Sequence, residues 1–121
     1  MFESPSRYEK APSIVIDGAF VLVLMPTHSV YILFSERANL YYVGNTDLDP
    51  QVRLAQHNEG VHPRAATKRG IPWKIVLVME CDSRLQARRI ETHIKRMKSR
   101  TYIENLLRYP EMRDKLRRRY A

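Results

Sequence analysis

The chain contains 121 residues, which suits a single domain with one core, and 44% of them are apolar, which excludes a disordered protein. The single cysteine, Cys81, excludes an internal disulfide and a cysteine-rich zinc site. The longest apolar run, residues 19–25, is too short to cross a membrane, which needs about 20 residues. We therefore expect a cytoplasmic protein without a membrane partner.

The net charge of +8 is concentrated in the C-terminal part of the chain. Residues 95–121 contain ten Lys or Arg and three acidic residues, whereas residues 1–94 contain eleven Lys or Arg and ten acidic residues. A basic segment attracts polyanions, mainly because phosphates release their counterions on binding. The charge favours nucleic acid as a partner, and a solvated helix surface is the alternative.

Residues 1–26 are predicted to form an N-terminal extension, either partly disordered or contributing an extra strand. Two short β-like runs, 14–16 and 19–25, are separated by the turn-forming pair Asp17-Gly18. An alternative hypothesis is that translation starts at Met25, which the intact mass of the native protein would decide. Residues 27–121 are predicted to form the folded domain, with a basic helical segment at its C-terminal end.

The domain begins with a hairpin signal. Residues 30–34 and 40–43 are rich in aromatic and β-branched residues, and a polar connection of hairpin length joins them. Asp49 and Pro50 then predict the start of a helix that ends near Asn58, because Asp caps a helix and Pro is tolerated at its first position. A basic loop is expected over 61–72. A third strand, expected to be central or covered, follows over 73–80.

Ser83 and Gln86 fit a capping box at the start of a second long helix. Its apolar stripe is predicted from the helical period, and consists of Leu85, Ile90, Ile94 and Met97. Residues 101–120 are also predicted to be helical, with Pro110 dividing them. The predicted fold class is therefore α+β, a small three-stranded and mostly antiparallel sheet flanked by helices in the order ββαβα plus C-terminal helices.

Several short motifs occur in a fixed order along this pattern. They are Val30-Tyr31-Ile32, Tyr42-Val43-Gly44, Arg53 and His57 in the first helix, Pro72-Trp73-Lys74, Glu91 in the second helix, and Lys98-Ser99-Arg100. In this order they resemble the GIY-YIG nuclease superfamily, over about residues 29–107, and look most similar to its small single-domain UvrC-like members. Paired tyrosines alone would more often be packing residues, so the ordered set carries the resemblance.

The resemblance implies a divalent-metal-dependent DNA endonuclease that leaves a 5′-phosphate and a 3′-hydroxyl. Glu91 would bind Mg²⁺ or Mn²⁺, because Mg²⁺ keeps most of its waters and needs few protein ligands; the alternative is an ion pair with Lys95, one helical turn away. Arg53 would grip a phosphate and His57 would exchange a proton. Tyr31 would position or deprotonate the nucleophile, with its pKa lowered by nearby cations, and Tyr42 would bind a phosphate oxygen.

The register of the hairpin decides whether Tyr41 or Tyr42 lies on the face of Tyr31. The residues leave this open, and the motif selects Tyr42, with Tyr41 as the packing residue. Contacts with the DNA backbone are predicted for five basic residues, Arg64, Lys68, Arg69, Lys98 and Arg100, although a solvated loop is the alternative for the first three. Because no second recognition module is evident, DNA structure or a protein partner would direct the enzyme, in repair or recombination at the nucleoid. The oligomeric state stays open.

The sequence also departs from the family pattern. Val30 replaces the first glycine, Asn45 stands where many relatives have a lysine or an aromatic residue, and the spacing from Tyr42 to Arg53 is one residue longer than usual. These departures motivate an alternative function, a catalytically weak or inactive nucleic-acid-binding module on the same fold. A third hypothesis is a module that binds RNA or an acidic protein through its basic tail.

Overall fold

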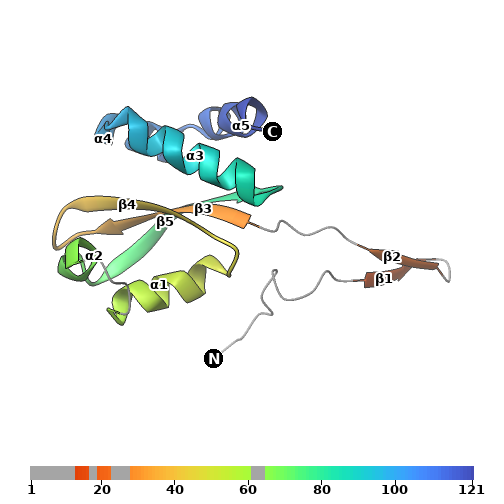
Figure 1. Ribbon diagram of the computed structural model, residues 1–121, viewed down its shortest axis with the longest axis horizontal. Helices are drawn as coiled ribbons and strands as arrows, with labels where there is room; N and C mark the ends of the chain where they lie inside the picture. Colours follow the sequence, from red (N-terminus) through yellow and green to blue (C-terminus); the bar gives the residue numbers. More distant parts are fainter. Residues whose placement is uncertain (1–12, 17–18, 23–27, 61–64) are drawn as a thin grey trace.

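A computed structural model describes residues 13–16, 19–22, 28–60 and 65–121. It contains a three-stranded sheet in the order β4-β3-β5, with both pairings antiparallel, so the predicted fold class is confirmed (Figure 1). The strands of this sheet are β3 (His28–Ser35), β4 (Leu40–Thr46) and β5 (Trp73–Cys81). The helices are α1 (Pro50–Asn58), α2 (Ala65–Arg69), α3 (Arg84–Met97), α4 (Arg100–Arg108) and α5 (Pro110–Arg119).

The N-terminal segment forms a separate antiparallel pair, β1 (Ser13–Ile16) and β2 (Ala19–Leu22). This pair is a two-stranded sheet of its own. Met25, the predicted alternative start, lies outside the described residues. Within the described part of the chain, no helix is long and apolar enough to span a membrane.

The central strand of the sheet is β3, so β5 is covered and not central, which is the second of the two predicted alternatives. Val30, Tyr31, Ile32 and Leu33 are fully buried, because helices cover both faces of β3 and strands flank both of its edges. β5 lies at an edge, and its middle residues, 75–78, are only partly buried. An apolar run that is covered on both faces does not reveal whether both of its edges are also paired.

On the face of the sheet covered by α1, local sequence signals set the start of this helix and the position of α2. The Asp49 side chain accepts a hydrogen bond from the backbone N–H of Gln51 at 2.9 Å, and Pro50 occupies the first turn, as predicted. The loop expected over 61–72 contains the short helix α2, while residues 61–64 lie outside the described part. The Trp73 indole donates to the carbonyl of Thr67 at 2.7 Å, which anchors α2 to the start of β5.

The face of α3 that packs on the sheet differs from the predicted stripe. Ile90 and Ile94 are buried as expected, but Leu85 and Met97 are 55% and 46% exposed. Leu85 precedes Ile90 by five residues, which rotates it by about 140° from the buried face. Gln86 and Ala87 occupy that face instead. The side-chain oxygen of Gln86 accepts a hydrogen bond from the backbone N–H of Asp82, and Ser83 caps the helix.

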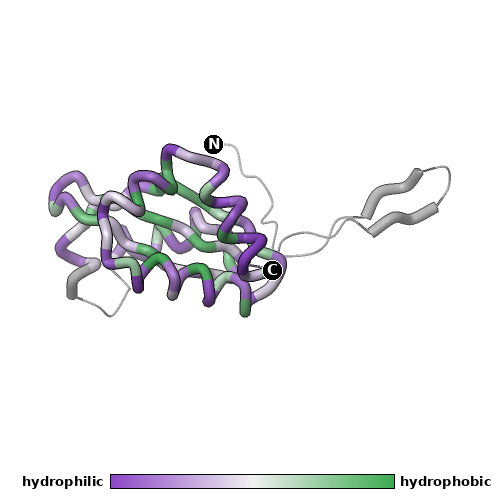
Figure 2. The backbone as a smooth tube through the Cα atoms, turned by 90° about the horizontal axis from the view of Figure 1, so that it is seen from above, coloured by the Kyte–Doolittle hydropathy of each residue, from purple (hydrophilic) through white to green (hydrophobic). Residues whose placement is uncertain are grey.

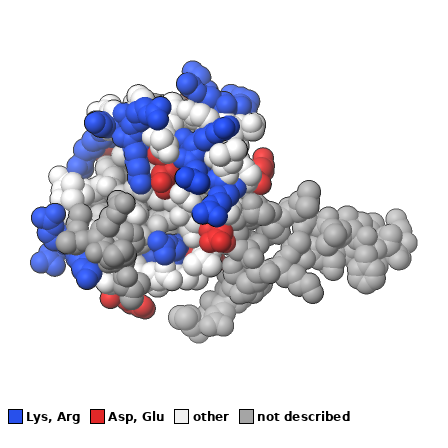
Figure 3. Space-filling model, viewed as in Figure 1, with Lys and Arg blue, Asp and Glu red and all other residues white. Residues whose placement is uncertain are grey.

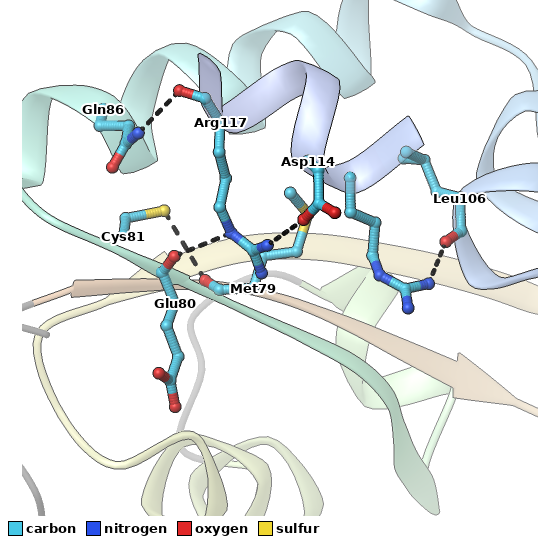
Figure 4. A network of polar contacts seen from close by, with 8 residues as sticks. Met79, Glu80, Cys81, Gln86, Leu106, Asp114 and Arg117 are labelled. Atoms are coloured by element: carbon cyan, nitrogen blue, oxygen red, sulfur yellow. Dashed lines mark hydrogen bonds and ion pairs between the residues drawn. The ribbon is translucent and has the colours of Figure 1, made fainter. Parts of the chain in front are cut away.

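The C-terminal helices pack behind α3, on the side away from α1 (Figure 1). Arg117 donates from Nε to the carbonyl of Glu80 at 3.1 Å, and the Gln86 amide donates to the carbonyl of Arg117 at 3.0 Å (Figure 4). Leu116 is buried at the centre of this contact. The last residues of the chain therefore form a helix, α5, that is docked on the domain.

The sheet separates two apolar clusters of different character. The larger one lies between the sheet and α3–α5 and is mainly aliphatic, whereas the smaller one lies on the α1 side and contains Tyr31, Leu33 and Trp73. In Figure 2 the colour alternates between green and purple along the helices, as expected when one side of each helix is buried. Figure 3 shows many of the Lys and Arg side chains over the helical layer of α3–α5.

Candidate active site

The hairpin register decides which tyrosine accompanies Tyr31. Tyr42 pairs with Leu33, and Gly44 pairs with Tyr31, so Tyr42 and Tyr31 share the face covered by α1. Their ring centroids lie 6.3 Å apart. Tyr41 lies on the opposite face, where its ring contacts Phe34 and the guanidinium of Arg100. The placement agrees with the choice of Tyr42 from the motif, with Tyr41 as the packing residue.

Tyr31 is buried and forms a hydrogen bond with a buried histidine. Its Oη lies 3.1 Å from Nε2 of His57, on the last turn of α1. The ring passes over Gly44, where a Cβ atom would lie 2.6 Å from both Cζ and Oη of Tyr31. Only glycine permits this close approach, so Gly44 allows the hydroxyl to extend across β4, which is an edge strand of the sheet.

Burial raises the pKa of Tyr31 to about 12, although a hydrogen bond from Arg53 lowers it in part. The negative charge of Glu91 makes a smaller contribution that also raises this pKa. Arg53 lowers the pKa of Tyr31 as expected, but the net pKa is raised, and a further lowering by a bound metal stays a prediction. The net pKa is raised because desolvation of the buried phenolate outweighs the favourable effect of the one arginine beside it.

Arg53 lies on α1, one helical turn before His57, so the two side chains share a helix face as predicted. Its guanidinium donates to the side-chain Oε1 of Gln56 at 2.5 Å and also forms a hydrogen bond with Tyr31. The side chain is half-buried, so part of the guanidinium remains accessible to a ligand. Arg53 thus presents a permanent positive charge beside the Tyr31 hydroxyl.

Glu91 approaches the same edge of the sheet from α3. Its Oε1 accepts a hydrogen bond from the Asn45 amide at 2.8 Å, and its Oε2 lies 3.3 Å from Nζ of Lys95. The predicted alternative, an ion pair with Lys95, is therefore present. Such an exposed pair contributes only about 0.3–0.5 kcal/mol, so it leaves the carboxylate available to a stronger ligand.

Two hollows border this edge. The first has a volume of about 260 Å³ and a mainly polar lining that includes Asn45, Asp47, Arg53 and Arg84. The second has a volume of about 420 Å³ and a mainly apolar lining that includes Tyr42 and Lys95. Asn45 belongs to the first and Lys95 to the second, and Glu91 contacts both of them. Glu91 therefore lies where the two hollows approach each other.

The donor set is consistent with a hard cation that keeps most of its waters. Within the described residues, no group of three or more His, Cys, Asp or Glu side chains is placed to hold a metal ion. Glu91 is a single carboxylate with 17% side-chain exposure, and the Asn45 amide fixes its orientation. One oriented carboxylate suits Mg²⁺ or Mn²⁺, which takes its remaining ligands from water and substrate phosphate, and does not suit Zn²⁺.

Those residues predicted to contact the DNA backbone that the structure describes lie in two places. Lys68 and Arg69 are exposed on α2, next to Trp73, while Arg64 lies outside the described residues. Lys98 and Arg100 both line the apolar hollow at the junction of α3 and α4. Arg100 also donates to the carbonyl and to the side-chain oxygen of Asn39, at 2.8 and 2.7 Å, so it has a second role in holding the β3–β4 turn.

Two residues of the site were not predicted from the sequence. Asn45 had been counted as a departure from the family pattern, yet its amide contacts Glu91. Arg84 lines the polar hollow opposite Arg53, and on α3 it precedes Glu91 by seven residues, which is two helical turns. That spacing places Arg84 and Glu91 on one side of the helix, and is the only signal in the sequence that points to Arg84.

The comparison with known proteins agrees with this geometry. The family sequence model of the GIY-YIG catalytic domain matches residues 27–103. No curated protein and no solved structure matches the chain significantly. The matched range contains the hairpin, α1, β5 and α3, and with them the two tyrosines, Arg53, His57 and Glu91. Because the model covers more than half of the chain, this protein belongs to the GIY-YIG nuclease superfamily.

Proposed function

We propose that this protein is a divalent-metal-dependent DNA endonuclease that hydrolyses a phosphodiester bond in DNA of a particular structure. The observation that carries the proposal is the convergence of Tyr31, Arg53 and His57 with Glu91 at one edge of the sheet, although α1 and α3 cover opposite faces. A cationic group, a hydroxyl with a proton acceptor and a carboxylate together supply what phosphodiester hydrolysis requires.

Arg53 binds a non-bridging oxygen of the cleaved phosphate and neutralises charge that grows there in the transition state. Arg84, across the polar hollow, binds the same or the neighbouring phosphate. Tyr42 contacts a phosphate oxygen through its hydroxyl. Glu91, oriented by Asn45, would hold Mg²⁺ or Mn²⁺, which when bound supplies charge neutralisation and acidifies water.

Tyr31 and His57 act on the attacking water as a pair. With a pKa of about 12, Tyr31 is a weak base by itself at neutral pH. Its hydroxyl instead transfers its proton to Nε2 of His57, 3.1 Å away, while it accepts one from the water. The phenolate therefore never accumulates, because the proton of the water ends on Tyr31 while the original proton of Tyr31 ends on Nε2 of His57.

The finer assignments rest on the resemblance and on the size of the domain. A UvrC-like member with no second recognition module would select nicks, flaps or branches, or would depend on a protein partner for targeting. Such a substrate predicts a role in DNA repair or recombination, with the protein at the nucleoid in the cytoplasm. The basic side chains over α3–α5, seen in Figure 3, support DNA as the partner through phosphate contacts.

The test incubates the purified protein with end-labelled single-stranded, duplex, nicked, flap and branched DNA, with Mg²⁺, with Mn²⁺ or with chelator. We expect metal-dependent cleavage that falls at least about a hundredfold in Glu91→Ala, whereas DNA affinity measured in chelator stays unchanged. Glu111→Ala is the matched control, because it removes an exposed carboxylate from α5, outside the matched family region. Cleavage that persists in Glu91→Ala contradicts the assignment of Glu91.

The alternative function is a nucleic-acid-binding module that lacks useful activity. The Lys95–Glu91 ion pair supports it, because both carboxylate oxygens of Glu91 already have partners in the protein. It predicts DNA binding without cleavage under every metal condition, and a melting temperature that does not change with Mg²⁺. Preferential binding to RNA at matched salt would instead favour the third hypothesis.

A further inference from the structure

The two hollows beside Glu91 differ in what they can bind. The polar hollow has Arg53 and Arg84 in its lining and suits a phosphate. The other hollow is larger, and its lining is mainly apolar, with Val43, Ile94 and Ile103 among its residues. A phosphate would gain little from these three side chains, because they offer no hydrogen bonds. The second hollow is therefore suited to a flat and largely apolar group.

Aromatic and basic side chains complete this apolar hollow. Tyr41 and Tyr42 both line it, although they lie on opposite faces of the sheet, so the hollow extends around the open edge of β4. Phe34 lies against the Tyr41 ring with centroids 4.8 Å apart, and the Arg100 guanidinium lies 5.2 Å from that ring's centroid. These contacts hold Tyr41 in place before any ligand arrives, which reduces the entropic cost of binding.

Three cations, Lys95, Lys98 and Arg100, line the same hollow. An apolar floor with aromatic walls and a basic rim matches a nucleotide, whose base stacks on aromatic rings while its phosphate meets the cations. An extended peptide along the β4 edge would also find apolar walls. It would not account for the cations, nor for the contacts of the lining with the active site, where Lys95 contacts Glu91 and the Tyr42 ring contacts the His57 ring.

We propose that the apolar hollow seats an unpaired nucleobase next to the phosphate that the enzyme cleaves. This inference rests on the proposed function and names its substrate class. A paired base is stacked inside a duplex and cannot reach the hollow, so the substrate must have a nucleotide that is unpaired or displaced beside the cleaved bond. Structure selection would then come from this hollow and not from a second recognition module.

The test measures affinity by fluorescence anisotropy with labelled DNA in chelator, so that no cleavage is needed. Three duplexes of one sequence are compared: fully paired, with one unpaired thymine, and with an unpaired abasic residue at the same place. The last two duplexes have similar bends and charges and differ mainly in the base. We expect the thymine duplex to bind about tenfold more tightly than the abasic duplex.

Leu40→Glu places a charge at the hollow without disturbing the core, because Leu40 is 50% exposed. We expect it to reduce the ratio of the two affinities to about one. Leu85→Glu is the matched control, with the same change of charge at a 55% exposed leucine that does not line this hollow, and it should keep the ratio. Each ratio is taken within one variant, so a general electrostatic loss of affinity cancels.

Equal affinities of the unchanged protein for the thymine and abasic duplexes would overturn the inference and leave the hollow to another occupant, such as a peptide. The same conclusion follows if Leu40→Glu keeps the ratio, or if Leu85→Glu loses it equally. These outcomes are independent of the proposed catalysis. A base-dependent affinity without cleavage would support base binding in the hollow and contradict the proposed nuclease activity. Cleavage without a base-dependent affinity would support the nuclease activity and contradict base binding in the hollow.

Discussion

The two faces of the three-stranded sheet use different chemistry. The face under α3 is packed with aliphatic side chains such as Val30, Ile32 and Ile90, which have one role, the exclusion of water. The face under α1 buries polar groups instead, among them the Tyr31 hydroxyl and the His57 imidazole. Buried polar groups are costly unless they are paired, so this face gives up stability to hold reactive atoms in fixed positions.

The two faces meet at the open edge of β4. Tyr31 reaches this edge from one side across Gly44, and Glu91 reaches it from the other through Asn45. The comparison teaches that a thin sheet edge can combine side chains from two separate layers into one site. It predicts that mutations on the α3 face act on stability, those on the α1 face act on catalysis, and those at the edge act on both.

The largest effect is expected for Tyr31→Phe, on the α1 face. Loss of the hydroxyl removes the proton path to His57, and we expect the cleavage rate to fall about a thousandfold. The free energy of unfolding should fall by only about 1 kcal/mol, because the ring still fills its space. Single-turnover cleavage and urea unfolding measure the two effects. A variant that cleaves at the normal rate would remove Tyr31 from the mechanism.

Ile90→Ala tests the opposite face. Ile90 is fully buried, so we expect a loss of about 2–5 kcal/mol in the free energy of unfolding. Below the melting transition, cleavage per folded molecule should stay within about twofold of the original, because the helix still presents Glu91. Urea unfolding and active-site titration separate the two quantities. A strong loss of cleavage in the fully folded variant would show that the two faces are coupled.

Gly44→Ala acts at the edge where the faces meet. The added methyl group would lie 2.6 Å from Cζ and Oη of Tyr31, so the buried ring must move. We expect a stability loss of about 1–3 kcal/mol together with a loss of cleavage of about tenfold or more. Gly60→Ala is the control, since its positive φ of 74° makes alanine strained there while the nearest atom is 3.9 Å from the new Cβ. It should reduce stability alone.

The smallest effect is a dependence of stability on alkaline pH. The pKa of Tyr31 is about 12 in the folded protein and about 10 in an unfolded chain, so the folded state holds this proton more tightly. Its contribution of about 2–3 kcal/mol is complete below pH 10 and is lost as the pH rises toward 12. Between about pH 9 and about pH 11, urea unfolding should show about half of this loss, roughly 1 kcal/mol, and Tyr31→Phe should reduce it. Tyr109→Phe, at an exposed tyrosine, should leave it intact.

Those parts of the structure that depend on neighbours along the chain could be predicted from the amino-acid sequence. The Asp49 cap and Pro50 mark the start of α1, the polar connection at 35–39 marks the hairpin, and Pro110 separates α4 from α5. In each case a few adjacent residues carry the physical cause, whether a hydrogen-bond acceptor, a fixed φ or a missing N–H. The order of the elements and the fold class follow from these local signals.

Features that depend on contacts between distant parts of the chain could not be predicted and became visible in the folded structure. The strand register placed Tyr42 and not Tyr41 beside Tyr31, and the rotation of α3 buried Gln86 in place of Leu85. The role of Asn45 appeared only when α3 came against β4, because its partner Glu91 is 46 residues away. The pKa of Tyr31 likewise reflects the burial that packing imposes, since desolvation is a property of the folded environment and not of any motif.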